Sequence, residues 1–320
     1  KFKAIEMAKI ELEVAHKYYW YLRYHKYKTS NGKNFEYLEA DSSYYQFLDR
    51  IDINSEHYCE TYQYLMFLQA HLDDCFIRNY NFFDYFTEKG WSQEQFKFDL
   101  NYKSKWINEH LDGVNKDYGF YSLLSSPSVN KAFSNSTDLF YDNLHSIYSN
   151  LQENYADSLI FDQCKTICDG YLNIEPGVKA PPLELSNRDG EIVSLEDFSG
   201  KIVYIDFWGT WCGPCIASIP QHNQLQDKFS NKDVIFLNIA LEHDEKAIES
   251  WKIFLVENEF QGIHVVAEKS FNNDQIKAYM INSAPSYVLI DKKGNIAKSR
   301  APKPKNAYEE INKLLDQDHL

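Results

Sequence analysis

The sequence predicts two domains of different class: an all-α domain over residues 1–173, then an α/β domain with a central mixed sheet flanked by helices over residues 174–320. Apolar residues recur at helical spacing in the first domain, whereas strand-length apolar runs alternate with helix-like segments in the second. Between them, Pro176, Gly177 and Pro181 end the helical pattern. A chain of 320 residues also exceeds one typical hydrophobic core.

The first domain is expected to consist of amphipathic helices. Glycines are rare there, its one proline is Pro127, and no alternating strand pattern with a hairpin signal is evident. Its many tyrosines and phenylalanines are typical of core and rim positions, although protein interfaces are also enriched in aromatic residues, so that a client-docking role stays open. Two sets of apolar residues have helical spacing: Tyr58, Tyr62, Leu65, Leu68, Leu72 and Phe76, and then Leu144, Ile147, Leu151, Tyr155 and Leu159.

The second domain is expected to run strand, helix, strand, helix, hairpin, helix after an initial hairpin. Asn187-Arg188-Asp189-Gly190 is a strong turn signal within that first hairpin. Asp244 is a plausible N-cap for the helix that passes through Trp251 and Phe254. The expected strands are the first hairpin within 183–193, the buried strands 202–208 and 234–240, and the second hairpin 287–290 with 296–299.

The motif Trp211-Cys212-Gly213-Pro214-Cys215 follows directly after the apolar run 202–208. A strand that ends in Cys-x-x-Cys at the start of a helix is typical of a redox-active dithiol. The same spacing makes half of a zinc site, but no second Cys-x-x-Cys or closely spaced His pair follows Cys215, so we predict no metal. The motif therefore favours redox chemistry.

The helix start explains the expected roles of the two cysteines. Unpaired amides there carry partial positive charge and should lower the pKa of Cys212 below the free value of about 8.5, which makes Cys212 the expected nucleophile. Cys215, one turn further in and less exposed, should attack the mixed disulfide that Cys212 forms with a client. Pro214 is tolerated in a first helical turn, and Gly213 lets another backbone approach the sulfur.

Asp206 lies inside the predicted strand 202–208. Burial would raise its pKa and let it exchange a proton near pH 7, so we expect it to be the general base that deprotonates Cys215. The alternative is a structural aspartate that is hydrogen-bonded to a neighbouring side chain.

From about Glu175 to Leu320 the chain resembles the TlpA/ResA branch of the thioredoxin superfamily, which are membrane-tethered or periplasmic thiol-disulfide oxidoreductases of bacteria. The resemblance implies a thioredoxin-like fold and a peptide-binding surface that includes Trp211, Gly213, Pro214 and Ala284, with Pro285 as a cis proline facing the dithiol. The residues that carry it are Gly177-Val178-Lys179-Ala180-Pro181, Asp189-Gly190, Val193-Ser194-Leu195, Gly200-Lys201-Ile202-Val203, Phe207-Trp208-Gly209-Thr210-Trp211-Cys212-Gly213-Pro214-Cys215, Ala284-Pro285-Ser286 and Asp291-Lys292-Lys293-Gly294.

The resemblance also implies partners and a compartment. The partners are client proteins with disulfides and an upstream thiol-disulfide electron donor, without a cofactor, in the periplasm or cell envelope of a bacterium. Gly213-Pro214 between the cysteines is more similar to reducing members than to oxidising ones. Several cytochrome-maturation members carry a glutamate where this chain has Ser218, which weakens apocytochrome c as a client. Peroxidase activity ranks low, because Thr210 is two residues before Cys212 rather than three.

Composition excludes some other classes. The net charge of −14 argues against a nucleic-acid partner. No apolar run reaches the roughly 18 residues needed to span a bilayer, and a signal or tether outside the given sequence stays open because the chain starts at Lys1.

Three further points stay open. Cys59, Cys75, Cys164 and Cys168 lie outside the motif and are expected to be buried thiols, with a second dithiol at Cys164 and Cys168 as the alternative.

Glu242 and His243 follow a strand end and are expected to be solvated loop residues rather than part of a client groove. In an alternative functional hypothesis the helical domain is a scaffold or binding protein, and the dithiol only senses redox state.

Overall fold

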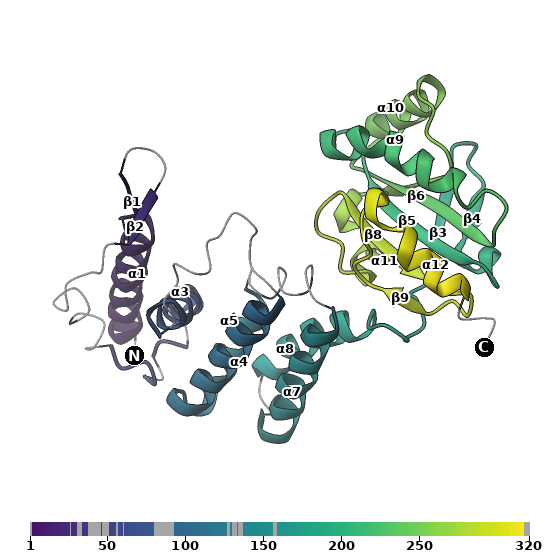
Figure 1. Cartoon of the computed structure of the whole chain (residues 1–320). Helices are drawn as coiled ribbons and strands as arrows, with labels where there is room; N and C mark the ends of the chain where they lie inside the picture. The colour runs from purple at the N-terminus through teal and green to yellow at the C-terminus, as the bar shows by residue number, and fades with distance from the viewer. Residues whose placement is uncertain are drawn as a thin grey trace. The chain divides into compact units, whose positions relative to one another are not determined.

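A computed structural model of the chain divides into two compact units, Lys1–Cys168 and Asp169–Leu320, which are described separately below. Most of their helices and strands are labelled in Figure 1. The domain limits 1–173 and 174–320 remain a prediction. The residues that the structure describes are 2–25, 27–30, 34–37, 46, 51–55, 57–59, 61–79, 93–126, 129, 133, 137–155 and 159–316.

The first unit is built mainly from helices, as its apolar spacing predicts. It also contains a short antiparallel hairpin of β1 (Tyr27–Ser30) and β2 (Asn34–Tyr37), which we did not expect. The dipeptide Asn31-Gly32 between them is a known hairpin signal in sequences. The helices are α1 (Phe2–His25), α3 (Tyr62–Asn79), α4 (Gln93–His110), α5 (Gly113–Leu124), α7 (Thr137–Tyr155) and α8 (Leu159–Leu172), the last of which passes into the second unit.

The core of the first unit forms where the apolar stripes of its helices meet. Leu68 and Leu72 of α3 are buried, and α3 packs against α1 and α5. Tyr58, the first residue of the same predicted stripe, precedes α3 and is buried, whereas Tyr62, the first residue of α3, is 70% exposed. Among the described residues, no helix combines the length and the apolar composition that crossing a bilayer requires.

The second unit is organised around a seven-stranded mixed sheet with the order β4-β3-β7-β6-β5-β8-β9. β5, β6 and β7 are parallel, and the remaining pairs are antiparallel. This confirms the predicted thioredoxin-like class. The strands are β3 (Glu184–Asn187), β4 (Ile192–Ser194), β5 (Ile202–Trp208), β6 (Val234–Glu242), β7 (Ile263–Glu268), β8 (Ser286–Ile290) and β9 (Ile296–Lys298).

Helices cover both faces of this sheet. Buried side chains of β5, β6 and β8 pack with α9 and α12 in one cluster, and Trp208 of β5 packs with Trp251 of α10 in another. On the opposite face, Phe207 contacts Tyr279, which directly follows α11. The helices are α9 (Gly213–Asp227), α10 (Glu245–Glu257), α11 (Asp274–Ala278) and α12 (Tyr308–Asp316), with 3-10 helices η3 (Leu195–Phe198), η4 (Ser270–Asn272) and η5 (Pro304–Asn306).

Both predicted hairpins and both predicted buried strands are present. Asp244 caps α10, since its side chain accepts a hydrogen bond from the Ala247 amide at 2.9 Å. Sequence reasoning missed β7, η4 and α11 between the predicted helix and the second hairpin. β7 contains only a short buried run, Val265 to Ala267, and α11 has only five residues, so neither has a strong periodic signal.

The sheet topology brings three segments to one edge. β5 lies between β6 and β8 with all seven of its residues buried. β6 runs parallel to β5, so the carboxyl ends of both strands lie at the same edge. β8 runs antiparallel, so its first residue, Ser286, lies opposite Phe207 near the end of β5. The segments that follow β5 and β6 and precede β8 therefore meet there.

Candidate active site

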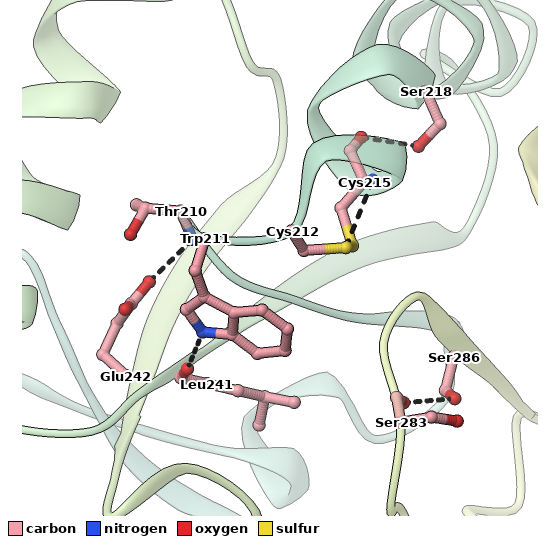
Figure 2. The surroundings of a disulfide bond; sticks show 9 residues. All are labelled: Thr210, Trp211, Cys212, Cys215, Ser218, Leu241, Glu242, Ser283 and Ser286. Atoms are coloured by element: carbon pink, nitrogen blue, oxygen red, sulfur yellow. Dashed lines mark hydrogen bonds between the residues drawn. A yellow bond between two sulfur atoms is a disulfide. The ribbon is translucent and has the colours of Figure 1, made fainter.

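The two cysteines of the motif lie at the start of α9 and form a disulfide (Figure 2). Cys212 is the N-cap residue of α9, and the Cys215 amide donates to its Sγ at 3.3 Å. Pro214 lies in the first turn, where the helix requires no amide donor from it. The sequence predicts this position at the helix start for Cys212.

The expected difference in exposure between the two cysteines is absent. Cys212 and Cys215 are both 3% exposed, so the prediction of a less exposed Cys215 is wrong for the disulfide form. Both sulfurs belong to an apolar cluster with Trp208, Ala240 and Trp251. In contrast, Trp211, Gly213 and Pro214 are exposed beside them.

The turn between β5 and α9 is held by the end of β6. The Trp211 Nε1 donates to the Leu241 carbonyl oxygen at 2.8 Å, and the Thr210 amide donates to Glu242 Oε1 at 2.9 Å. Figure 2 shows both contacts on the side of the turn away from Cys215. Gly209 precedes this turn, and a Cβ there would lie only 2.5 Å from Trp211 Nε1. The indole ring thus folds back over a position without a side chain.

Trp211 remains 46% exposed although its indole nitrogen is bonded. Its ring lies 6.0 Å from the ring of His243 and 5.9 Å from that of Phe271, measured between centroids. Phe271 belongs to η4, which sequence reasoning did not connect with the site. The left-handed backbone at Lys269 and Ser270, which sequence does not signal for these residues, precedes it. Trp211, His243 and Phe271 form an aromatic group beside the dithiol.

Glu242 corrects one of our expectations. It is 0% exposed rather than solvated, because the last residue of β6 lies under the β5–α9 turn. Burial raises the pKa of its carboxyl, and hydrogen bonding by the backbone amide and the side chain of Thr210 opposes that shift. His243, the next residue, is exposed as expected.

Asp206 is buried in the middle of β5, where it lies between Asn238 of β6 and Tyr287 of β8 in the strand register. Burial raises the pKa of its carboxyl from 3.8 to about 8. Its Oδ1 has no hydrogen-bond partner among the described residues, which is unlike a purely structural aspartate. The carboxyl can therefore hold or release a proton near neutral pH.

The peptide bond between Ala284 and Pro285 is cis, as the resemblance implies. Ala284 packs against the cluster that contains both cysteines, so this loop borders the disulfide. The Ser286 hydroxyl donates to the Ser283 carbonyl oxygen at 2.7 Å and closes the loop (Figure 2). The structure thus brings Cys212, Cys215 and Ala284 into one cluster, with the cis Pro285 next to Ala284. Asp206 lies inside β5, the strand that leads to the cysteine turn.

The other four cysteines are buried thiols. Cys59 Sγ donates to Asn115 Oδ1 at 2.7 Å, and Cys75 Sγ lies 3.3 Å from His71 Nε2. Burial raises the pKa of the Cys164 thiol to about 12. Within the described ranges, no group of three or more His, Cys, Asp or Glu side chains is arranged to hold a metal ion.

Comparisons with known proteins match the second part of the chain. The Redoxin family model matches residues 175–315. The thiol-disulfide oxidoreductase ResA of Bacillus cereus is 33% identical over 155 residues, which cover 47% of this chain and 86% of that protein. The thioredoxin-like protein YneN of Bacillus subtilis is 31% identical over 126 residues, which cover 39% of this chain and 71% of that protein.

Solved structures match the same region. The crystal structure of the thioredoxin domain of a thiol-disulfide oxidoreductase from Bacteroides vulgatus is 27% identical in sequence. The match covers 43% of this chain and 96% of that chain, with a TM-score of 0.39.

Proposed function

Because this chain belongs to the ResA family of thiol-disulfide oxidoreductases, we propose that it reduces disulfide bonds in client proteins through Cys212 and Cys215. The observation that carries the proposal is the disulfide between these residues at the start of α9, beside a loop with a cis proline. The reduction of clients and the residue roles below belong to this proposal.

In the first step the Cys212 thiolate attacks one sulfur of a client disulfide. A bond forms between Cys212 Sγ and that sulfur, the client disulfide breaks, and the other client sulfur leaves as a thiolate. The amides at the start of α9 stabilise the attacking thiolate, which is consistent with the Cys215 amide donating to Cys212 Sγ. The exposed Gly213 and Pro214 leave room for a client backbone next to this sulfur.

In the second step the Cys215 thiolate attacks Cys212 Sγ. The Cys212–Cys215 disulfide forms and the second client sulfur leaves, so the client gains two electrons and the enzyme loses two. We propose Asp206 as the base that accepts the Cys215 proton, directly or through water, because its pKa of about 8 suits proton transfer near neutral pH. An upstream dithiol donor must then reduce the enzyme.

The client would bind as an extended segment across the dithiol. Trp211, Ala284 and Pro285 would border it, since Trp211 is exposed beside the site and Ala284 packs on the cysteine cluster. We propose that the protein works in the cell envelope of a bacterium, where disulfides in clients persist. The helical unit would assist docking of a client or partner.

The direct test is to trap the client. In full-length Cys215→Ala the first step proceeds but the second cannot, so a mixed disulfide with Cys212 should accumulate and run as a reducible band in electrophoresis. Cys212→Ser is the matched control and should trap nothing. Insulin reduction by the wild-type chain, coupled to a dithiol donor, should fall to background in Cys212→Ser; equal rates would contradict the proposal.

The alternative is a redox-sensing scaffold in which the helical unit carries the main function. Comparing turnover of residues 169–320, a compact unit, with that of the full chain against the trapped client separates the two. A lower kcat/KM for the shorter protein would support client docking by the helical unit. Equal values would remove that role, and a client that binds the full chain without being reduced would support the scaffold.

A further inference from the structure

Glu242 has an environment that the proposed exchange steps do not explain. Its carboxyl group is completely buried at the end of β6, at the sheet edge that carries the dithiol. Oε1 accepts the Thr210 amide at 2.9 Å, and Oε2 has no hydrogen-bond partner among the described residues. Burying a carboxyl group with one oxygen unbonded is costly, so a position that needs no acid would be filled more stably by an apolar residue.

The carboxyl group bonds to the turn that carries the nucleophile. Thr210 is followed by Trp211 and Cys212, and the Cys212 amide donates to the Gly209 carbonyl oxygen at 3.0 Å, which closes the same turn. The preceding residue of β6, Leu241, accepts the Trp211 indole N–H at 2.8 Å. Two successive residues of β6 therefore fix two successive residues of the turn, one by its backbone and one by its side chain (Figure 2).

The ionisable neighbours of Glu242 along the chain and in the strand register are His243, Asp244 and Glu268. His243 and Asp244 follow it and affect its ionisation in opposite directions. Glu268 of β7 is its partner in the strand register, but that side chain is exposed. Thr210 is the contact from the β5–α9 turn. Only the Thr210 contact, out of these, links the carboxyl group to the dithiol.

We propose that Glu242 is a positioning residue for disulfide exchange, whose carboxyl group holds the Thr210 amide and so fixes the turn that presents Trp211 and Cys212 to a client. This inference rests on the proposed function. An attacking sulfur must approach a client disulfide in line, and a displacement of about 1 Å can cost roughly 100-fold in rate. Without the acceptor, the Thr210 amide would lose a buried partner and the turn would move to satisfy it.

The kinetic test compares three full-length variants. Glu242→Ala should lower kcat/KM for insulin reduction about 10- to 100-fold at a temperature where the protein is fully folded by near-UV circular dichroism. Glu242→Gln keeps a carbonyl acceptor for Thr210 and should restore the rate to within about 3-fold of wild type. Glu268→Ala removes the same charge from the register partner and should have the wild-type rate.

A spectroscopic test does not depend on a stable alanine variant. In the oxidised wild-type chain, the Thr210 amide resonance should shift with pH as Glu242 ionises, with a midpoint above the ordinary glutamate value because burial raises the pKa of that carboxyl. In Glu242→Gln the shift should vanish, while in Glu268→Ala it should persist. A purely structural carboxyl group elsewhere would not move this amide.

The outcomes separate this inference from the proposed function. If Glu242→Ala keeps the wild-type kcat/KM, if Glu242→Gln is as slow as Glu242→Ala, or if the Thr210 amide does not titrate in wild type, the positioning role is wrong while client reduction stands. If the wild-type chain reduces no disulfide, the proposed function is wrong, and the Thr210 titration still reports whether Glu242 holds the turn.

Discussion

Two pairs of cysteines, one in each part of the molecule, have similar spacing but different environments. Cys212 and Cys215 occupy the first turn of α9, form a disulfide and are bordered by exposed residues. Cys164 and Cys168 lie inside α8, are fully buried and remain thiols. The amides at a helix start are open to a sulfur, whereas those inside a helix are bonded to carbonyl groups four residues earlier.

The two pairs differ in where the cysteines lie on their helices and in what covers them. Burial raises the pKa of Cys164 to about 12, so its nucleophilic form is nearly absent at neutral pH. Asp206 offers a parallel contrast, because it is also buried but has a pKa of about 8. Burial therefore keeps the Cys164 thiol protonated at neutral pH, whereas it brings the pKa of Asp206 close to neutral pH.

Alkylation should separate the two cysteine pairs most strongly. In the reduced full-length chain at pH 7, iodoacetamide should modify Cys212 at least 10³-fold faster than Cys164, because a thiol with a pKa of about 12 is ionised to roughly 1 part in 10⁵. Peptide mass spectrometry over a time course measures both rates. Similar rates at the two cysteines would contradict the expected difference in reactivity between Cys212 and Cys164.

Removing the buried carboxyl group of Asp206 should have the next largest effect, on the rate of disulfide exchange. Asp206→Asn should slow release of the mixed disulfide by about 100-fold, since general bases contribute 10²–10⁴-fold. In wild type, release should accelerate as pH rises through about 8, where Asp206 becomes the base, and the variant should lose this step. Stopped-flow fluorescence on a preformed mixed disulfide gives the rate, and an unchanged profile in Asp206→Asn would assign the base elsewhere.

The same aspartate should make stability depend on pH. Its folded pKa of about 8 is above the unfolded value of about 3.9, so its favourable contribution is complete below pH 4 and is lost as pH rises through 8. The free energy of unfolding of Asp206→Asn should therefore exceed that of wild type by a few kcal/mol at pH 9 and by a smaller amount at pH 4. Urea unfolding at both pH values measures the difference, and an equal gain would rule out a protonated Asp206.

The smallest effect is expected from substitution of Cys164 inside α8. Cys164→Ser places a hydroxyl group in a fully buried position and should lower the free energy of unfolding by about 1–3 kcal/mol. Insulin reduction by the full chain should not change. Thermal unfolding and the turnover assay together check this, because a loss of turnover with full stability would give Cys164 a redox role.

Much of the second unit could be predicted because its signals are local. The strand 202–208 and the cysteine spacing placed the dithiol at a helix start, and the position of Asp206 inside that strand indicated burial and a raised pKa. The cis bond before Pro285 required the family resemblance, since no local pattern distinguishes it. Asp244 could be assigned as an N-cap because capping needs only the residues next to it.

The remaining features depend on contacts between distant segments. Glu242 looked like a solvated residue because sequence does not show that the turn after β5 covers the end of β6. Phe271 reaches Trp211 only through left-handed backbone at Lys269 and Ser270, which these residues rarely adopt. β1 and β2 form a hairpin within a mainly helical unit, where the helical pattern outweighed the Asn31-Gly32 signal.

The antiparallel pairing of β5 with β8 has a consequence for how this domain can be altered. Ser286 is fixed opposite Phe207 by the strand register, so the proline loop reaches the sulfurs regardless of the length of chain between them. Insertions in the loop between α10 and β7 would lengthen that loop without separating the cysteine turn from the proline loop. Such domains can therefore acquire new recognition segments, by evolution or by grafting, while their chemistry stays in place.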